Sequence, residues 1–280
     1  MFLLFNFVMF SSAFVFFISA YQFSNTSVFL SGAAYCNKEN YKTMVLAGPA
    51  EGFLVHSTLY HAKSDLQGYT GVMPSTKTIY VVFRGSSSVL NWLDDFKFVK
   101  TEYLTYPSCQ CLVHKGFYGA SNGLKSQVFE SVTFLQKKYG YEDIVVTGHS
   151  LGAAIAQLIM MELSLSLPLS GAVGLYSYNF GQPRIGDAKY AGFVNTIIDD
   201  DHLLRFTHNK DMVPHVPPVE MGYLHSCREI FEDENGKIKE CSNVDCEDAL
   251  CADQYSFMDT NTDDHSIYLQ HVMSCESSVY

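Results

Sequence analysis

Residues 143–156 read DIVVTGHSLGAAIA. The β-branched run Ile144 to Thr147 is typical of a short buried strand, and the Ala-, Leu- and Ile-rich stretch from Leu151 to about Leu165 is typical of a helix. Between them, a serine stands between two glycines, which let the strand and the helix approach closely while a sharp turn lifts the hydroxyl out of the sheet. A tight turn with a buried serine is the alternative, but the strand and helix around it favour Ser150 as a nucleophile.

The nucleophile needs a base, and the base needs an orienting acid. Both are expected downstream, in the order serine, acid, histidine. Of the acids Asp187, Asp199 to Asp201 and Asp211, the last follows an expected strand at 202–207, at the sheet edge where sites assemble. The spacing does not separate the four histidines that follow: His215, His225, His265 and His271. His149, tethered beside the serine, is expected to serve packing.

Outward from this stretch, strands and helices alternate. Strands are expected at 78–83, 173–180 and 202–207, a helix at 117–138, and a hairpin at 228–241 with a type I′ turn at Asn235-Gly236. This alternation predicts an α/β fold with a mainly parallel central sheet flanked by helices. Since 280 residues is ordinary for one α/β domain and no linker divides the chain, a single domain over residues 21–280 is expected.

The first twenty residues predict export. Sixteen of them are apolar, the small residues Ser19 and Ala20 precede Tyr21, and the first charged side chain is Lys38. This is typical of a signal peptide at residues 1–20, although an uncleaved anchor helix would have a similar length. The protein is therefore expected to be secreted, or to reside in the lumen of the secretory or digestive pathway. One glycosylation sequon, at Asn25, is expected at the exposed start of the mature chain.

The composition excludes three classes of protein. With 18 basic and 29 acidic residues, and a net charge of −11, the chain lacks the basic stripe of a nucleic-acid reader. A hydrophobic share of 48%, with 19 Gly and 8 Pro, excludes a disordered or collagen-like chain.

Eight cysteines follow the leader, an even number that favours disulfides in an oxidising compartment. They are Cys36, Cys109, Cys111, Cys227, Cys241, Cys246, Cys251 and Cys275. Four of them near His225 could instead bind zinc: Cys227, Cys241, Cys246 and Cys251. Their spacing, however, lacks the two-residue knuckle of structural zinc sites. Disulfides are therefore favoured, with their pairing open.

Several motifs in one order make the chain resemble the fungal-type class 3 lipases of the α/β-hydrolase fold, over most of residues 24–275. Beside the Ser150 elbow, the matching stretches are Asp65 to Tyr69, Val82 to Ser88, Asn91-Trp92, Val113 to Phe117, Phe180 to Gly186, Asp211 to Pro214, and Asp264 to Tyr268. The resemblance implies a catalytic triad of Ser150, Asp211 and His265, with Leu151 and Ser86 as oxyanion donors. It implies structural roles for His114, in a hydrogen bond, and for Arg84, paired with a carboxylate.

The same resemblance implies a Cys36–Cys275 disulfide. A Cys109–Cys111 bridge is not expected, because a single intervening residue would strain the ring. Family members usually carry one bridge before the catalytic histidine, whereas this chain has four cysteines there.

A lid is expected after the oxyanion strand. Its apolar residues fall near one face of a short helix and include the only Trp in the chain: Val89, Leu90, Trp92, Leu93 and Phe96. Such a stripe is ordinarily core packing, but its position favours a lid that swings open on a lipid surface.

These features predict a secreted, monomeric triacylglycerol lipase that acts on lipid esters at an oil–water or membrane interface, without cofactor, metal or nucleic acid. A phospholipase A1 or a feruloyl-type esterase on the same scaffold is the alternative. A catalytically inactive lipid-binding module is a further alternative, although an intact triad argues against it.

Overall fold

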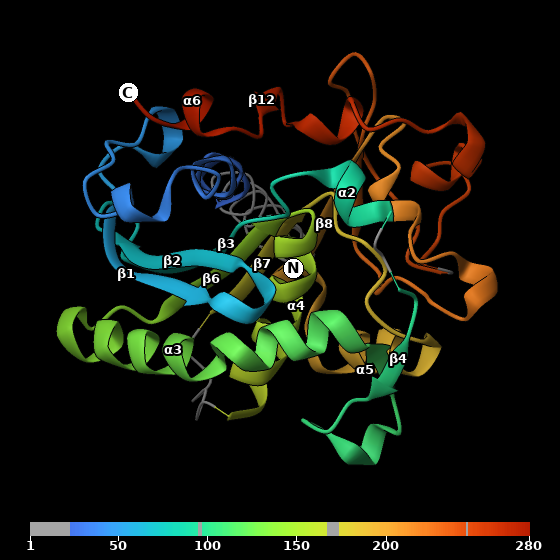
Figure 1. The fold of residues 1–280 in the computed structure, drawn as a ribbon, viewed down its shortest axis with the longest axis horizontal. Helices are drawn as coiled ribbons and strands as arrows, with labels where there is room; N and C mark the ends of the chain where they lie inside the picture. Colours follow the sequence, from blue (N-terminus) through green and yellow to red (C-terminus); the bar gives the residue numbers. More distant parts are fainter. Residues whose placement is uncertain (1–22, 95–96, 167–173, 245) are drawn as a thin grey trace, which may run out of the picture.

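One eight-stranded sheet, in the order β1-β2-β3-β6-β7-β8-β9-β10, runs through the computed structural model, which describes residues 23–94, 97–166, 174–244 and 246–280 (Figure 1). Its strands are β1 Leu54–His61, β2 Leu66–Met73, β3 Thr78–Phe83, β6 Asp143–His149, β7 Leu175–Phe180, β8 Leu203–His208, β9 Glu229–Glu232 and β10 Ile238–Glu240. The neighbours from β3 through β9 pair in parallel, while β1, β2 and β10 add antiparallel edges. The expected mainly parallel sheet is confirmed; β1 and β2 were not anticipated.

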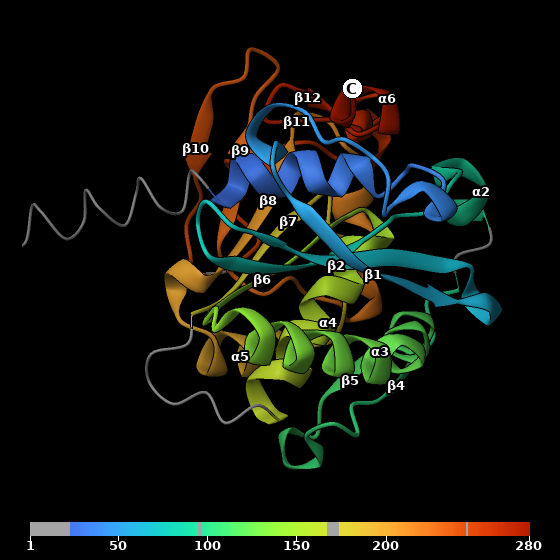
Figure 2. The same cartoon turned by 90° about the vertical axis from the view of Figure 1, so that its left-hand side faces the viewer.

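Two layers cover the sheet, as Figures 1 and 2 show. Helices α3 (Lys115–Tyr139), α4 (Leu151–Ser166) and α5 (Ala188–Ile197) pack on one face; the helix at residues 23–33 and the C-terminal segment pack on the other. Side chains of β3 alternate accordingly: Ile79 and Val81 join the first core, Tyr80 and Val82 the second. Both faces of the central strands are therefore buried, which explains their continuous apolar sequence.

Helix α3 confirms the helix expected at 117–138, and local chemistry sets its ends. The His114 ring accepts a hydrogen bond from the Phe117 N–H at the start. At the other end Gly140 adopts a left-handed conformation with φ 67°, and its N–H reaches the Gln136 carbonyl. This end brings the chain back toward β6 and the Ser150 turn.

The hairpin of β9 and β10 is present, but the type I′ turn expected at Asn235-Gly236 is wrong. Of those two residues only Gly236 has a positive φ, and the loop spans residues 233–237. The Asp233 carboxylate accepts the backbone N–H groups of Asn235 and Lys237, both at 2.9 Å. This Asp-centred loop replaces the two-residue turn.

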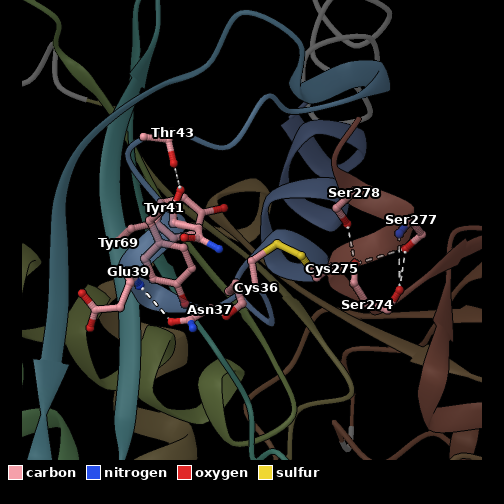
Figure 3. Close-up of a disulfide and its surroundings, with 12 residues drawn as sticks. Cys36, Asn37, Glu39, Tyr41, Thr43, Tyr69, Ser274, Cys275, Ser277 and Ser278 are labelled. Carbon is pink, nitrogen blue, oxygen red and sulfur yellow. Dashed lines mark hydrogen bonds between the residues drawn. A yellow bond between two sulfur atoms is a disulfide. The ribbon is translucent and has the colours of Figure 1, made fainter.

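All eight cysteines form disulfides. Cys36–Cys275 links the chain after the first helix to α6 (Cys275–Ser278) (Figure 3), and the four open cysteines pair as Cys227–Cys246 and Cys241–Cys251. Their thiolates are therefore not available to zinc. The doubt about Cys109–Cys111 was wrong: Gln110 between them has a left-handed φ of 53°, which turns the chain back and leaves the Cα atoms 5.2 Å apart.

The leader at residues 1–20 lies outside the described residues. Asn25 does not sit at an exposed chain start: it is half-buried in the helix at residues 23–33, and Thr26 and Ser27 are buried. Packing of this helix against the sheet is the cause. Among the residues that the structure describes, no helix combines the length and apolarity needed to cross a membrane.

Candidate active site

Ser150 occupies the turn between β6 and α4. Its φ of 59° is left-handed, a strained conformation for a residue with a side chain. The turn is held by the Ser150 N–H, which donates to the Phe180 carbonyl at 2.9 Å. A Cβ on Gly148 would lie 2.5 Å from the Gly152 backbone, and one on Gly152 would lie 2.4 Å from the Phe83 carbonyl oxygen. Only glycine fits at either position, because strand and helix touch there.

The structure brings Asp211 and His265 together. His265 Nδ1 lies 2.7 Å from Asp211 Oδ2, and both side chains are buried. Because a carboxylate oxygen accepts, Nδ1 carries the proton. The Tyr268 hydroxyl donates to the same Oδ2, and the Val213 N–H donates to Oδ1 at 2.8 Å. The Asp211 carboxylate is thus held by three donors, as expected of a group that orients a base.

A second carboxylate, that of Asp264, ties together the two loops that carry this pair. Its Oδ2 accepts from the Asn209 side chain at 3.1 Å and from the Lys210 N–H at 3.2 Å. The Met212 N–H also donates to the Asn261 carbonyl at 3.1 Å. These contacts hold Asp211 and His265 in register although 54 residues separate them.

Ser150 and His265 both lie against the turn after β7. The Phe180 carbonyl accepts the Ser150 N–H, and a Cβ on the next residue, Gly181, would lie 2.8 Å from His265 Cε1. Among the described residues, neither the Ser150 hydroxyl nor His265 Nε2 has a hydrogen-bond partner, and both atoms are buried. Both atoms are therefore free to contact a third molecule, as the expected nucleophile and base require.

The two expected oxyanion donors flank the serine. Leu151 begins α4, so its N–H belongs to a helix N-terminus, where the partial positive charge favours an anion. On the other side, a Cβ on Gly85 would lie 2.8 Å from Ser150 Cβ, so the Gly85-Ser86 segment touches the serine. Arg84 braces this segment by pairing with Asp65 at 3.2 Å, as the family resemblance implies.

Helix α2 (Val89–Asp94) lies beside the oxyanion segment, where a lid was expected. Its expected apolar residues do not all face inward: Leu90 is 60% exposed, whereas Trp92 is partly buried and stacks on Phe117 with 6.4 Å between ring centres. Phe96 lies outside the described residues, and of the Val89 side chain nothing is described.

A cavity of about 500 Å³ opens between α2 and the start of α3. It is lined by Trp92, Val99, Phe117, Ala120 and Leu151, with Ser64, Lys97, His114, Lys115 and Gly116. Burial lowers the pKa of His114 to about 4, so its ring is neutral; it also hydrogen-bonds the Lys97 carbonyl at 2.7 Å. Leu151 lines this cavity and also begins α4, at the expected oxyanion position.

The other sequence candidates lie elsewhere. Asp187 caps α5, and Asp199 to Asp201 precede β8. His215 lies 3.6 Å from Asp253, His225 hydrogen-bonds the Pro214 carbonyl, and His271 the Ser278 hydroxyl. Tyr268 had no role assigned from the sequence, because nothing in the local pattern marks a tyrosine that reaches a carboxylate 57 residues away.

A buried serine at a strained strand–helix turn and a parallel sheet covered on both faces define an α/β-hydrolase. The family model for "Lipase (class 3)" matches residues 80–221, half of the chain. The chain therefore belongs to the class 3 lipase family, which confirms the resemblance read from the motifs.

Individual relatives agree. The chain is 34% identical to a lipase of Rhizomucor miehei over 199 residues, which is 67% of this chain and 54% of that one. It is 32% identical to the secreted mono- and diacylglycerol lipase A of Penicillium cyclopium, over 58% of this chain and 50% of that one. It thus spans about half the length of these relatives. A solved triacylglycerol lipase whose catalytic centre is a serine-protease triad superposes with a TM-score of 0.79 at 28% identity, covering 90% of this chain and 95% of that one.

Proposed function

We propose that this protein hydrolyses the carboxylic esters of acylglycerols through Ser150, His265 and Asp211, and that it acts as a triacylglycerol lipase. The observation that carries the proposal is the pairing of a strained, buried serine with a histidine whose Nδ1 is held by a carboxylate at 2.7 Å. The triad of the solved relative supports it.

In this mechanism His265 Nε2 takes the proton of the Ser150 hydroxyl while the oxygen attacks the ester carbonyl. Asp211 stabilises the imidazolium that forms, and the N–H groups of Leu151 and Ser86 bind the oxyanion. The imidazolium then returns its proton to the leaving alcohol, the ester C–O bond breaks, and an acyl-enzyme remains. Water, activated by His265, hydrolyses it and regenerates the serine. His265 serves as base and acid in both halves of the reaction; Ser150 is the nucleophile of the first half and water that of the second.

The apolar cavity gives the acyl group a place beside the nucleophile, and α2 is the lid in this proposal. Trp92 is its inner contact and the exposed Leu90 its outer one. An apolar outer side is suited to a lipid surface, where opening would expose the site. The expected leader, the four disulfides and the name of the secreted Penicillium relative support secretion.

The test is the rate of hydrolysis of a short triglyceride, measured through its solubility limit. A jump in rate when droplets form supports a lipase with a lid; a smooth, saturable curve refutes the lid but leaves the serine chemistry. Ser150→Ala should reduce the rate by at least about 10³-fold, while Ser177→Ala, which removes another buried hydroxyl without a partner among the described residues, should not. Full activity in Ser150→Ala would refute the site.

Phospholipase A1 activity is the second candidate, because Lys97 and Lys115 line the cavity and none of its described lining residues is acidic. An anionic headgroup would suit these lysines. Faster turnover of phospholipid than of triglyceride in a parallel assay would favour this substrate. A feruloyl-type esterase fits the apolar lining less well, and an inactive lipid-binding module would fail to react with an organophosphate that labels Ser150.

A further inference from the structure

His149, the residue before Ser150, makes two hydrogen bonds from the interior of the site. Its side chain is buried, with Nε2 at 2.8 Å from the backbone oxygen of His265 and Nδ1 at 2.6 Å from the Tyr35 hydroxyl. Its ring also packs against the His265 ring, with 4.3 Å between the centres and a tilt of 33° between the planes. His149 therefore contacts both the backbone and the side chain of the residue that serves as base.

These partners fix the proton on His149. A carbonyl oxygen can only accept, so Nε2 carries the hydrogen. Burial, together with the nearby His265, holds the pKa of His149 well below its usual range, so the ring is neutral and Nδ1 must accept from the Tyr35 hydroxyl. Burial raises the pKa of Tyr35 well above its usual value, so this hydroxyl keeps its proton. The pair has one arrangement in which both bonds are made.

Tyr35 connects His149 to the opposite side of the site. A Cβ on Gly85 would lie 2.3 Å from the Tyr35 hydroxyl oxygen, so this oxygen rests against the segment that ends in Ser86. Tyr35 is followed by Cys36, whose disulfide to Cys275 fixes it (Figure 3). Tyr35 and His149 together connect the Gly85-Ser86 segment to the loop that carries His265.

We propose that His149 is a positioning residue: its imidazole N–H holds the His265 carbonyl, and thereby keeps the His265 ring aligned with Ser150, while the Tyr35 hydroxyl selects the tautomer that can do so. The inference rests on the proposed hydrolysis through Ser150 and adds a residue to it. The alternative is that His149 only fills space. Donation of a hydrogen bond and filling of space make different demands on a substitute, which allows them to be separated.

The experiment compares His149→Gln, whose amide N–H can still reach the His265 carbonyl, with His149→Leu, which fills the volume without a donor. The substrate is a soluble short-chain p-nitrophenyl ester below its solubility limit. His149→Leu should lower kcat by about 10²-fold, the cost of misplacing a catalytic group by about 1 Å. KM should change less than about twofold, because His149 is not among the described residues that line the cavity. His149→Gln should recover most of the loss, and Tyr35→Phe should show a smaller loss than His149→Leu.

The matched control is His271→Gln, another buried histidine that stacks on an aromatic ring, Phe29, and bonds one partner, Ser278, outside the site. It should lose stability but not kcat. Equal kcat in the Leu and Gln variants, or an unchanged kcat in both, overturns the proposal. If the Leu variant does not fold, the Gln and Phe variants decide: loss in Gln as large as in Ser150→Ala, or no loss in Tyr35→Phe, overturns it.

A spectroscopic measurement separates this inference from the proposed function. The proton of the His265–Asp211 hydrogen bond should give a downfield NMR resonance that broadens in Tyr35→Phe and His149→Leu, and remains sharp in His149→Gln and His271→Gln. A resonance unchanged in all four variants refutes positioning by His149. Absence of ester hydrolysis by the unaltered protein refutes the proposed function. In that case the resonance still reports whether His149 and Tyr35 position His265.

Discussion

Replacing Tyr268 by Phe isolates one hydrogen bond in the site. The change keeps the ring, which packs edge-on against Phe180 and His149, and removes only the hydroxyl that donates to Asp211 Oδ2. Asp211 is 1% exposed, so water cannot replace the lost donor. A hydrogen bond to a buried charged group contributes about 1.5–3 kcal/mol. At 2–4 °C per kcal/mol for a domain of this size, the variant should melt roughly 3–12 °C lower.

The same change should lower kcat by about tenfold, which corresponds to about 1.4 kcal/mol. The reason is that Asp211 Oδ2, which holds His265 Nδ1, loses its second donor, so the carboxylate is less firmly oriented. Burial, with Asp211 nearby, raises the pKa of Tyr268 well above its usual value, so the melting deficit should be constant from about pH 6 to pH 9. Thermal unfolding followed by circular dichroism measures it. Tyr223→Phe is the control, since its buried hydroxyl has no partner among the described residues. Equal melting temperatures for Tyr268→Phe and the unaltered protein would refute the reasoning.

Two further outcomes are expected. Burial holds the pKa of His114 at about 4, below the 6.5 of the unfolded chain, so its neutral ring contributes stability above pH 6.5 that is lost as the pH falls toward 4. The His114→Asn variant retains a helix cap, and its free energy of unfolding in urea should depend less on pH over that range. An identical slope in the variant and the unaltered protein would contradict this. Replacing Cys36 and Cys275 together by Ser opens a loop of 239 residues and should lower the free energy of unfolding by about 5 kcal/mol. The same change at Cys109 and Cys111, separated by two positions, should lower it by less than about 2 kcal/mol. Equal losses of stability in urea unfolding would contradict the dependence on loop length.

Local patterns in the sequence were enough to predict the central strand and helix of the fold. The β-branched run before Ser150 and the helix after it are set by neighbours within a few residues, so both were predictable. Strand β1 was not, because its side chains are mostly half-exposed and show no clear alternation. At the hairpin, the Asp233 side chain overrode the Asn235-Gly236 signal by binding the loop's own N–H groups.

The site was less accessible to sequence reasoning. Spacing alone left four histidines open, and only the family motif singled out His265, because the choice depends on which loop folds back over the end of β8. Tyr268 and Tyr35 contribute through hydroxyl groups at the ends of long side chains, at distances in sequence that no local pattern encodes. His149 was expected to serve packing; its two hydrogen bonds became visible only when the segments around it were placed together.

The Cys36–Cys275 bond closes residues 36–275 into a covalent ring. One peptide bond cut by a protease in any surface loop between these residues would therefore yield two segments that remain a single molecule, joined through sulfur. Such a nicked protein would keep its mass on a non-reducing gel and separate only after reduction. The strands and the Ser150 turn could then remain assembled, because the broken ends are still held in the same covalent frame. Where proteases are present, this ring would limit the effect of a single cleavage to the loop that is cut.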